Sequence, residues 1–452
     1  MSLALLFGIA AVFLFSLAHI GIQTSDDAAM LATTGALWDK HTFAIPDMEW
    51  LNERVTIGKY GKDGLLYAKF GAGQTLVAAV LYGIGEALFP KAEPYMWAGY
   101  PIVNSSAGAQ LALFDNVVLA GLIVGLVVYE AGELCGAHAA TITGIMLTLA
   151  SPFLFAARVF GAEIGAALGL LLAAMLARRA LKPDSSIPLW VSVAGLGIAV
   201  LFRPSALVFG FAWLVWVSRR PLRDWLSVGI ALALVTATIP GYNWLRYGDI
   251  FESGYGDYGS GFSIQLIGLA GYLLVPGRSL LLFAPWALLI LPTIVALFRR
   301  QLNWETGVAA GVVGFYLVHA MWQEWEGGWS FGPRLLIPIL PVIALTVANA
   351  FVKFPRLVMF CFLPASLLQI AALPVDPMTT HLNEIVREGA TFEEMAAGFR
   401  ETVWSPLGNI VVLQLKAIAT PEYFVWLVIW AIVCAAWIGY LLTSMPIENT
   451  RT

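Results

Sequence analysis

The chain has 452 residues, of which 59% are hydrophobic and 12% are charged. A soluble domain carries about twice that charged fraction, so the composition excludes an ordinary water-soluble globular protein. The net charge of -4 and the lack of a block of basic residues also argue against a nucleic-acid partner.

Apolar runs of about 17–22 residues recur along the whole chain, which predicts an all-α polytopic membrane protein with about 12–14 crossings. The first run lacks a basic segment before it and a small-residue cleavage site after it, so we expect a retained helix rather than a signal peptide. The runs expected to cross lie at about 3–22, 74–90, 107–129, 139–156, 160–178, 187–202, 205–218, 226–242, 280–298, 306–322, 335–352, 356–374 and 423–443.

Clusters of arginine and lysine set the expected sidedness. They follow four of the runs, at 178–182, 219–223, 299–300 and 353–356, and the positive-inside rule makes all four cytoplasmic. Counting from a cytoplasmic N-terminus, however, places the first cluster outside. Either a crossing is missing between Pro90 and Gln110, where PYMWAGYPIVNSS could form a short broken helix, or one of the runs does not cross.

The external loops include two long ones, at 23–73 and 375–421. Both contain stretches with helical spacing of apolar residues, at 27–38 and within HLNEIVREGATFEEMAAGFRETVW, which predict amphipathic helices lying on the membrane surface. The apolar segment 263–279 is interrupted by Pro276-Gly277 and favours a re-entrant hairpin over a crossing.

Two adjacent carboxylates, Asp26 and Asp27, come directly after the first run. Thr24 or Ser25 can cap a new helix there, and acidic side chains stabilise a helix N-terminus, so an ordinary acidic cap is one interpretation. The other is a catalytic base held at the membrane surface, which could remove the proton of an attacking hydroxyl.

Other polar side chains on the expected external side could converge with this pair on one cavity. Arginine and lysine there would neutralise a phosphate group, although each arginine alone could also snorkel to the interface. Tryptophan offers a platform for a sugar, or simply an anchor at the membrane interface. The candidates for the donor phosphate and sugar are Lys69, Gln74, Arg158, Glu163, Arg203, Arg246, Arg278 and Arg334, and those for a sugar platform are Trp322, Trp325 and Trp329.

Several motifs occur in a fixed order after the acidic pair: YAKFGAGQTLVAAVLYGIG, RVFGAEIGAALGLLLA, FRPSALVF, NWLRYGDIFESGYG, LLVPGRSLLLFAPW and WEGGWSFGPRLLIPILP. Over about residues 1–345 this set resembles bacterial GT-C glycosyltransferases, in the branch of the protein O-mannosyltransferases and the lipid A aminoarabinose transferase. The resemblance implies a GT-C fold, in which 1–345 forms the catalytic module with external loop 23–73, and 346–452 adds C-terminal helices with loop 375–421.

The same resemblance implies the chemistry. A sugar would pass with inversion from a polyprenyl phosphate to an acceptor hydroxyl on a glycan, lipid or protein, with Asp26 or Asp27 as base and Asp27 preferred. Lys69 and Gln74 match the loop before the second helix of that family, and the arginines and Glu163 fall where its polar groups approach the donor. No cofactor beyond the lipid-linked donor is expected, and no DxD triplet indicates a metal.

The implied location is the bacterial inner membrane, with the site facing the periplasm. Two alternatives remain open at this point: a flippase or transporter for a lipid-linked sugar, and a ligase or polymerase of lipid-linked glycans. A transporter would carry titratable groups in mid-helix and inverted repeats, whereas the polar groups here favour one face and no repeat is evident.

Overall fold

The computed structural model describes residues 2–16, 21–22, 24–255, 261–264, 266–328 and 330–372. The predicted crossing at 423–443, the predicted external loop at 375–421 and Trp329 lie outside these residues. The predicted division of the chain at residue 345 is not tested by the fold and stays a prediction.

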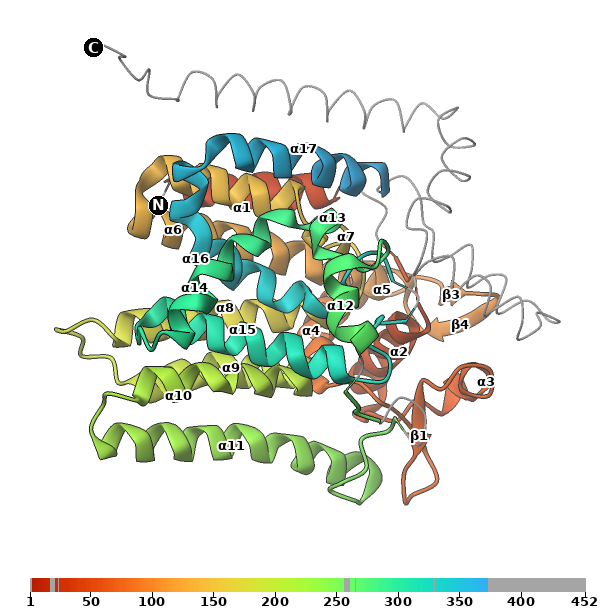
Figure 1. Cartoon of the computed structure of the whole chain (residues 1–452). Coiled ribbons are helices and arrows are strands. Elements are labelled where there is room, and N and C mark those ends of the chain that lie inside the picture. The colour runs from red at the N-terminus through yellow and green to blue at the C-terminus, as the bar shows by residue number, and fades with distance from the viewer. Residues whose placement is uncertain are drawn as a thin grey trace, which may run out of the picture.

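Long apolar helices run side by side and form the bulk of the molecule (Figure 1). Hydropathy and length make three stretches able to cross a bilayer, Ser106–Leu149, Leu222–Tyr247 and Arg334–Lys353, and six shorter apolar helices accompany them in the described part. The prediction of an all-α membrane protein is therefore confirmed. The helices of this bundle are α1 (Ser2–Ser16), α6 (Asp115–Leu149), α7 (Phe153–Ala156), α8 (Glu163–Ala180), η2 (Leu189–Ser192), α9 (Val193–Phe202), η3 (Pro204–Gly210), α10 (Phe211–Val217), α11 (Leu222–Tyr247), α12 (Leu266–Leu274), α13 (Leu280–Phe283), η4 (Pro285–Ile290), α14 (Leu291–Phe298), α15 (Trp304–Met321), η5 (Arg334–Ile339), α16 (Leu340–Lys353) and α17 (Pro355–Ala372).

The 35-residue α6 is two helices joined at Gly136, whose φ of 86° and ψ of 171° are not helical. A Cβ added at Gly132 would lie 3.7 Å from Ala140 Cβ, and one added at Gly144 would lie 2.6 Å from a methyl of Val128. Because residues equally far before and after Gly136 face each other, the two halves are antiparallel. This glycine reverses the chain in one residue, since φ in this range strains any side chain.

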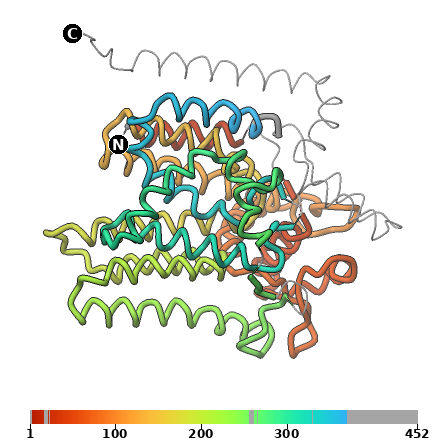
Figure 2. Tube along the Cα trace, in the orientation of Figure 1, coloured from red at the N-terminus to blue at the C-terminus, as the bar shows by residue number. Residues whose placement is uncertain are grey.

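The segment between α1 and α6 gathers at one end of the bundle, as the red to orange part of the tube shows (Figure 2). We call residues 24–114 the cap. Its strands form two hairpins, in which Gly58 pairs with Ala68 and Tyr95 with Val103. The elements of the cap are α2 (Ser25–Lys40), η1 (Pro46–Met48), α3 (Glu49–Asn52), β1 (Gly58–Tyr60), β2 (Leu66–Ala68), α4 (Ala72–Leu88), β3 (Tyr95–Trp97), β4 (Tyr100–Val103) and α5 (Ser106–Leu113).

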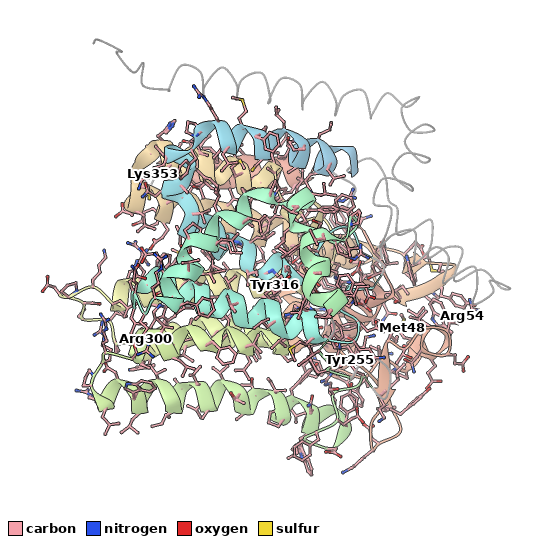
Figure 3. The ribbon with its side chains drawn as sticks, in the orientation of Figure 1. Met48, Arg54, Tyr255, Arg300, Tyr316 and Lys353 are labelled. Atoms are coloured by element: carbon pink, nitrogen blue, oxygen red, sulfur yellow. The ribbon has the colours of Figure 1, made fainter. Side chains whose placement is uncertain are left out.

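The cap lies opposite the basic clusters. Arg300 and Lys353 are at one end of the bundle, whereas Met48 and Arg54 of the cap are at the other (Figure 3). Since basic residues mark the cytoplasmic side, this arrangement agrees with an external position for the cap.

The expected crossing at 74–90 corresponds to α4, which also contacts the cap, and this crossing stays a prediction. Near its C-terminal end, Glu86 accepts a 2.7 Å hydrogen bond from Trp38 Nε1, and the hydroxyl of Tyr82 accepts one of 3.1 Å from the Ser105 amide. Both partners belong to the cap, so one face of α4 is held by the cap. The other face is apolar and exposed, at Leu76, Val80, Ile84 and Leu88.

Two expectations for this region were wrong. The segment PYMWAGYPIVNSS contains the hairpin of β3 and β4 instead of a broken helix, because Ala98 and Gly99 (φ 53° and 82°) form a two-residue turn between alternating side chains. Helix α2 exists but does not lie on the surface: it is buried from Asp27 to Gly35, since small and apolar residues surround its axis.

The nine residues of α12 span only about 14 Å, too short to cross a bilayer, which agrees with the re-entrant segment expected at 263–279.

Two hydrophobic cores meet at the external end of the bundle. One fills the space between the long helices, and the second fills the cap. The second core also contains residues of the bundle, namely Phe160, Ala162, Ala166 and Phe202. The cap is therefore seated on the external ends of α8 and α9, and the charged residues described next lie at this junction.

Candidate functional site

The structure separates the two adjacent aspartates. Asp27 is fully buried and completes a capping box: its amide donates to Thr24 Oγ1 and its Oδ2 accepts from the Thr24 amide, both at 3.1 Å. The side chain of Asp26 remains 27% exposed and faces Arg334, with 3.5 Å between Oδ2 and Nη1. Asp27 thus holds the helix start and also lies near Arg334, whereas Asp26 is partly exposed beside that guanidinium.

Glu163 lies at the centre of the charged group. Its Oε1 accepts a 2.6 Å bond from Arg203 Nη1 and a 2.7 Å bond from Arg334 Nε. Because Arg334 also pairs with Asp26, four side chains form one connected set, which we call the ionic cluster: Asp26, Glu163, Arg203 and Arg334. Two guanidiniums face two carboxylates, so the formal charges of the cluster balance.

Local sequence explains how Arg203 reaches this cluster. Pro204 ends α9, because the residue before a proline disfavours helical geometry, and Arg203 is extended at φ −137° and ψ 109°. Phe202 packs so closely on Gly73 and Gly165 that added Cβ atoms would come within 2.6 and 2.0 Å of its ring. The glycines of the FGAGQ and GAEIG segments therefore let α4 and α8 close around Phe202, which directs Arg203 to Glu163.

Two other predicted arginines hold loops through backbone carbonyls. Arg246 donates to the carbonyl oxygens of Ala68 and Phe70, the latter at 3.2 Å, and its guanidinium lies 4.0 Å from the ring centroid of Tyr242. Arg246 thus fastens the cap to the end of α11.

Arg278 does the same for the loop between α15 and η5. It donates to the carbonyl oxygens of Glu326 at 2.5 Å and Gly328 at 2.8 Å. In this loop, burial raises the pKa of the Glu326 carboxyl above its ordinary value, and nearby Glu324 raises it further.

The remaining predicted polar residues bond elsewhere. Lys69 Nζ donates to the Thr56 carbonyl at 2.7 Å and lies 5.3 Å from the ring centroid of Tyr255. Gln74 Nε2 donates to Asp115 Oδ2 at 2.8 Å, with both side chains buried. The buried guanidinium of Arg158 stacks 4.4 Å from the ring centroid of Phe155.

The predicted sugar platform is only partly open in this conformation. Trp325 is 2% exposed and packs edge to face with Tyr272, with 5.6 Å between ring centroids. Trp322 is half-buried and meets Tyr255 edge to face at 6.1 Å. Tyr255, which lies near the cap (Figure 3), was not among the predicted residues, because a single tyrosine in a glycine-rich loop gives no signal.

Sequence reasoning also missed a buried polar pair at the start of α6, Asp115 and Asn116. Asn116 Nδ2 donates 2.7 Å bonds to the carbonyls of Val159 and Gly161. Two polar residues opening an apolar run were a usable signal, since buried polar groups in membrane helices are costly. Within the described ranges, no group of three or more His, Cys, Asp or Glu side chains is placed to hold a metal ion.

Comparisons with known proteins bear on the fold. No family model matches the chain, and no curated protein matches its sequence. The structure of ArnT from Cupriavidus metallidurans bound to undecaprenyl phosphate matches with a TM-score of 0.52 and 15% identity, over 90% of this chain and 77% of that one. The apo form of that protein gives a TM-score of 0.52 at 16% identity, over 90% and 75% of the two chains.

An Archaeoglobus fulgidus oligosaccharyltransferase, solved with a tethered acceptor peptide, gives a TM-score of 0.47 at 13% identity, over 94% of this chain and 54% of that one. The match to ArnT covers nearly all of the present chain. By its fold, therefore, this chain is similar to ArnT.

Proposed function

We propose that the chain transfers a sugar from a polyprenyl phosphate to an acceptor hydroxyl at the external face of a bacterial inner membrane. The observation that carries this proposal is the ionic cluster, which brings two guanidiniums and a partly exposed carboxylate together at the junction of cap and bundle. The fold shared with ArnT, a protein solved with undecaprenyl phosphate, supports the choice of a lipid phosphate donor.

In this proposal Arg203 and Arg334 bind the donor phosphate, since guanidinium groups pair with phosphate oxygens through two parallel bonds. A phosphate at Arg334 competes with Asp26 for the same guanidinium, which lies 3.5 Å from the carboxylate. Donor binding thereby releases Asp26 to accept a proton.

The transfer is a single displacement. The acceptor hydroxyl gives its proton to Asp26, and its oxygen bonds to the anomeric carbon from the face opposite the phosphate. The bond from that carbon to the phosphate oxygen breaks, so polyprenyl phosphate leaves with the electron pair and the anomeric centre inverts. The two arginines stabilise the charge that develops on the phosphate.

The geometry favours Asp26 over Asp27 as the base, although Asp27 was slightly preferred with the resemblance and the sequence itself does not rank the two. The Oδ2 of Asp27 is engaged in the capping box and its side chain has no exposed surface, whereas Asp26 is partly open and meets the cationic side. A general base has to reach the proton that it removes.

The test uses purified protein, a labelled polyprenyl phosphate sugar and measurement of released polyprenyl phosphate. Asp26→Asn should lower the rate by about 10²–10⁴-fold, the usual contribution of a general base, with unfolding unchanged. Asp27→Asn serves as the matched variant and should keep most activity, because its amide oxygen can still accept the cap bond. Full activity in Asp26→Asn would reject it as the base, and wild-type protein that releases no lipid phosphate would favour a flippase.

A further inference from the structure

Asn116, a buried residue outside the ionic cluster, connects the parts that build it. It is 0% exposed and sits at the second position of α6. Its Nδ2 donates two bonds of 2.7 Å, to the carbonyl oxygens of Val159 and Gly161. A single amide group thus uses both of its hydrogens on the segment 157–162, directly before Glu163.

The same segment is also joined to the strand of chain that leads to Asp26. Val159 forms an isolated parallel bridge with Gly21, a few residues before helix α2. Gly161 contacts Glu163 so closely that an added Cβ would lie 2.3 Å from Oε2. The segment that Asn116 holds therefore contacts Glu163 directly. It is linked to Asp26 through Gly21, which precedes helix α2.

Asn116 is itself fixed from the other direction. Its neighbour Asp115 accepts the 2.8 Å bond from Gln74, which ties the start of α6 to the start of α4. The start of α4 packs on Phe202 through Gly73, and Phe202 directs Arg203 to Glu163. The bond between Gln74 and Asp115 therefore links the start of α6 to the position of Arg203.

We infer that Asn116 is a positioning residue: its amide donors hold the segment 157–162 so that Glu163 and Asp26 reach Arg334 together. This inference rests on the proposed function for its kinetic consequence, but the tether itself does not. Donor binding needs only the arginines, whereas the transfer rate also depends on the position of the base relative to the bound phosphate. A shift of about 1 Å in such a site can cost about a hundredfold in rate.

Two substitutions separate hydrogen bonding from packing. Asn116→Asp keeps the size of the side chain but turns an oxygen toward two carbonyls, whereas Asn116→Ala removes the amide altogether. If the donors matter, the Asp variant should lose more activity than the Ala variant, about a hundredfold against about tenfold in kcat, with the KM for the donor changed less than threefold. If the side chain only fills space, the order is reversed and the Asp variant resembles wild type.

Thr143→Ala is the matched control. Thr143 is equally buried in α6, but its hydroxyl donates to Ala139 within the same helix at 2.7 Å, so kcat should stay at the wild-type value. A drop in kcat for this control comparable to that of Asn116→Ala would overturn the specific role.

Hydrogen exchange measured by mass spectrometry tests the tether without any transfer assay. Peptides that cover 157–163 should exchange faster in both Asn116 variants than in wild type, and unchanged exchange overturns the inference. The wild type could transfer no sugar while the Asn116 variants still exchange faster than it does. That result would support the tether and reject the proposed function, so the two failures are distinguishable.

Discussion

Removing the charge of Glu163 should leave two arginines short of their partner. Breaking a buried ion pair by removing one member costs about 3–5 kcal/mol, and glutamine keeps one oxygen that can still accept a bond, so we expect Glu163→Gln to lose about 3 kcal/mol. The bonds at stake are those of 2.6 Å to Arg203 and 2.7 Å to Arg334. Thermal unfolding in detergent measures the loss.

The informative measurement adds undecaprenyl phosphate. A phosphate that binds at Arg203 and Arg334 replaces the missing carboxylate, so it should raise the unfolding temperature of Glu163→Gln more than that of the wild type. A ligand present at 100 times its Kd stabilises by about 2.7 kcal/mol, enough to detect.

Glu130 provides a matched control at the cytoplasmic end. It is buried and pairs with Arg178 at 2.5 Å and Arg179 at 3.0 Å, so Glu130→Gln should lose stability to a similar extent. The lipid should stabilise that variant no more than the wild type. Equal lipid shifts in both variants would refute the assignment of the phosphate to Arg203 and Arg334, and wild-type stability of Glu163→Gln would refute the role of this carboxylate.

Two further predictions concern the junction and the cap. Gly165→Ala places a Cβ 2.0 Å from the Phe202 ring and should lower the free energy of unfolding by about 1–3 kcal/mol through overpacking. Gly229→Ala is the control: its added Cβ meets no atom within 4 Å, so this variant should be neutral or slightly stabilised. Equal unfolding temperatures for the two variants would contradict the close approach of Phe202 to Gly165. Burial raises the pKa of the Glu252 carboxyl, but the hydrogen bonds from Lys59 and the Gly254 amide, together with the charge of Lys59, outweigh this and leave the pKa below the ordinary value of 4.5. The pair should therefore stabilise the loop fully above pH 4.5 and lose this effect as the pH falls through the lowered pKa, seen as faster proteolysis of 58–69 in acid; a rate that does not depend on pH below 4.5 would count against it.

The sequence could predict the bundle because apolar runs follow from transfer energies, and the expected sidedness stays a prediction. Runs of about 20 apolar residues favour a bilayer, and arginine clusters such as Arg299-Arg300 favour the cytoplasm, regardless of what the helices contact. The same reasoning could not show that α4 contacts the cap through Tyr82 and Glu86, because these contacts depend on partners elsewhere in the chain. The opposite face of α4 stays apolar and exposed, at Leu76, Val80, Ile84 and Leu88.

The candidate site was predictable in its residue types but not in how they are used. Arg203 and Arg334 meet a carboxylate, whereas Arg246 and Arg278 meet backbone carbonyls, which carry no signature in a sequence. Likewise the capping box of Asp27 depends on which of two adjacent acids falls at the third helical position. Such assignments need the fold, because they depend on partners distant along the chain.

The shared core of cap and bundle has a consequence for biogenesis. Residues 24–114 leave the ribosome first, yet their core is completed by Phe160, Ala162, Ala166 and Phe202, which are synthesised later. The cap therefore cannot finish packing until α8 and α9 have entered the membrane. Assembly of the ionic cluster is deferred further, because Arg334 follows both of these helices in the chain.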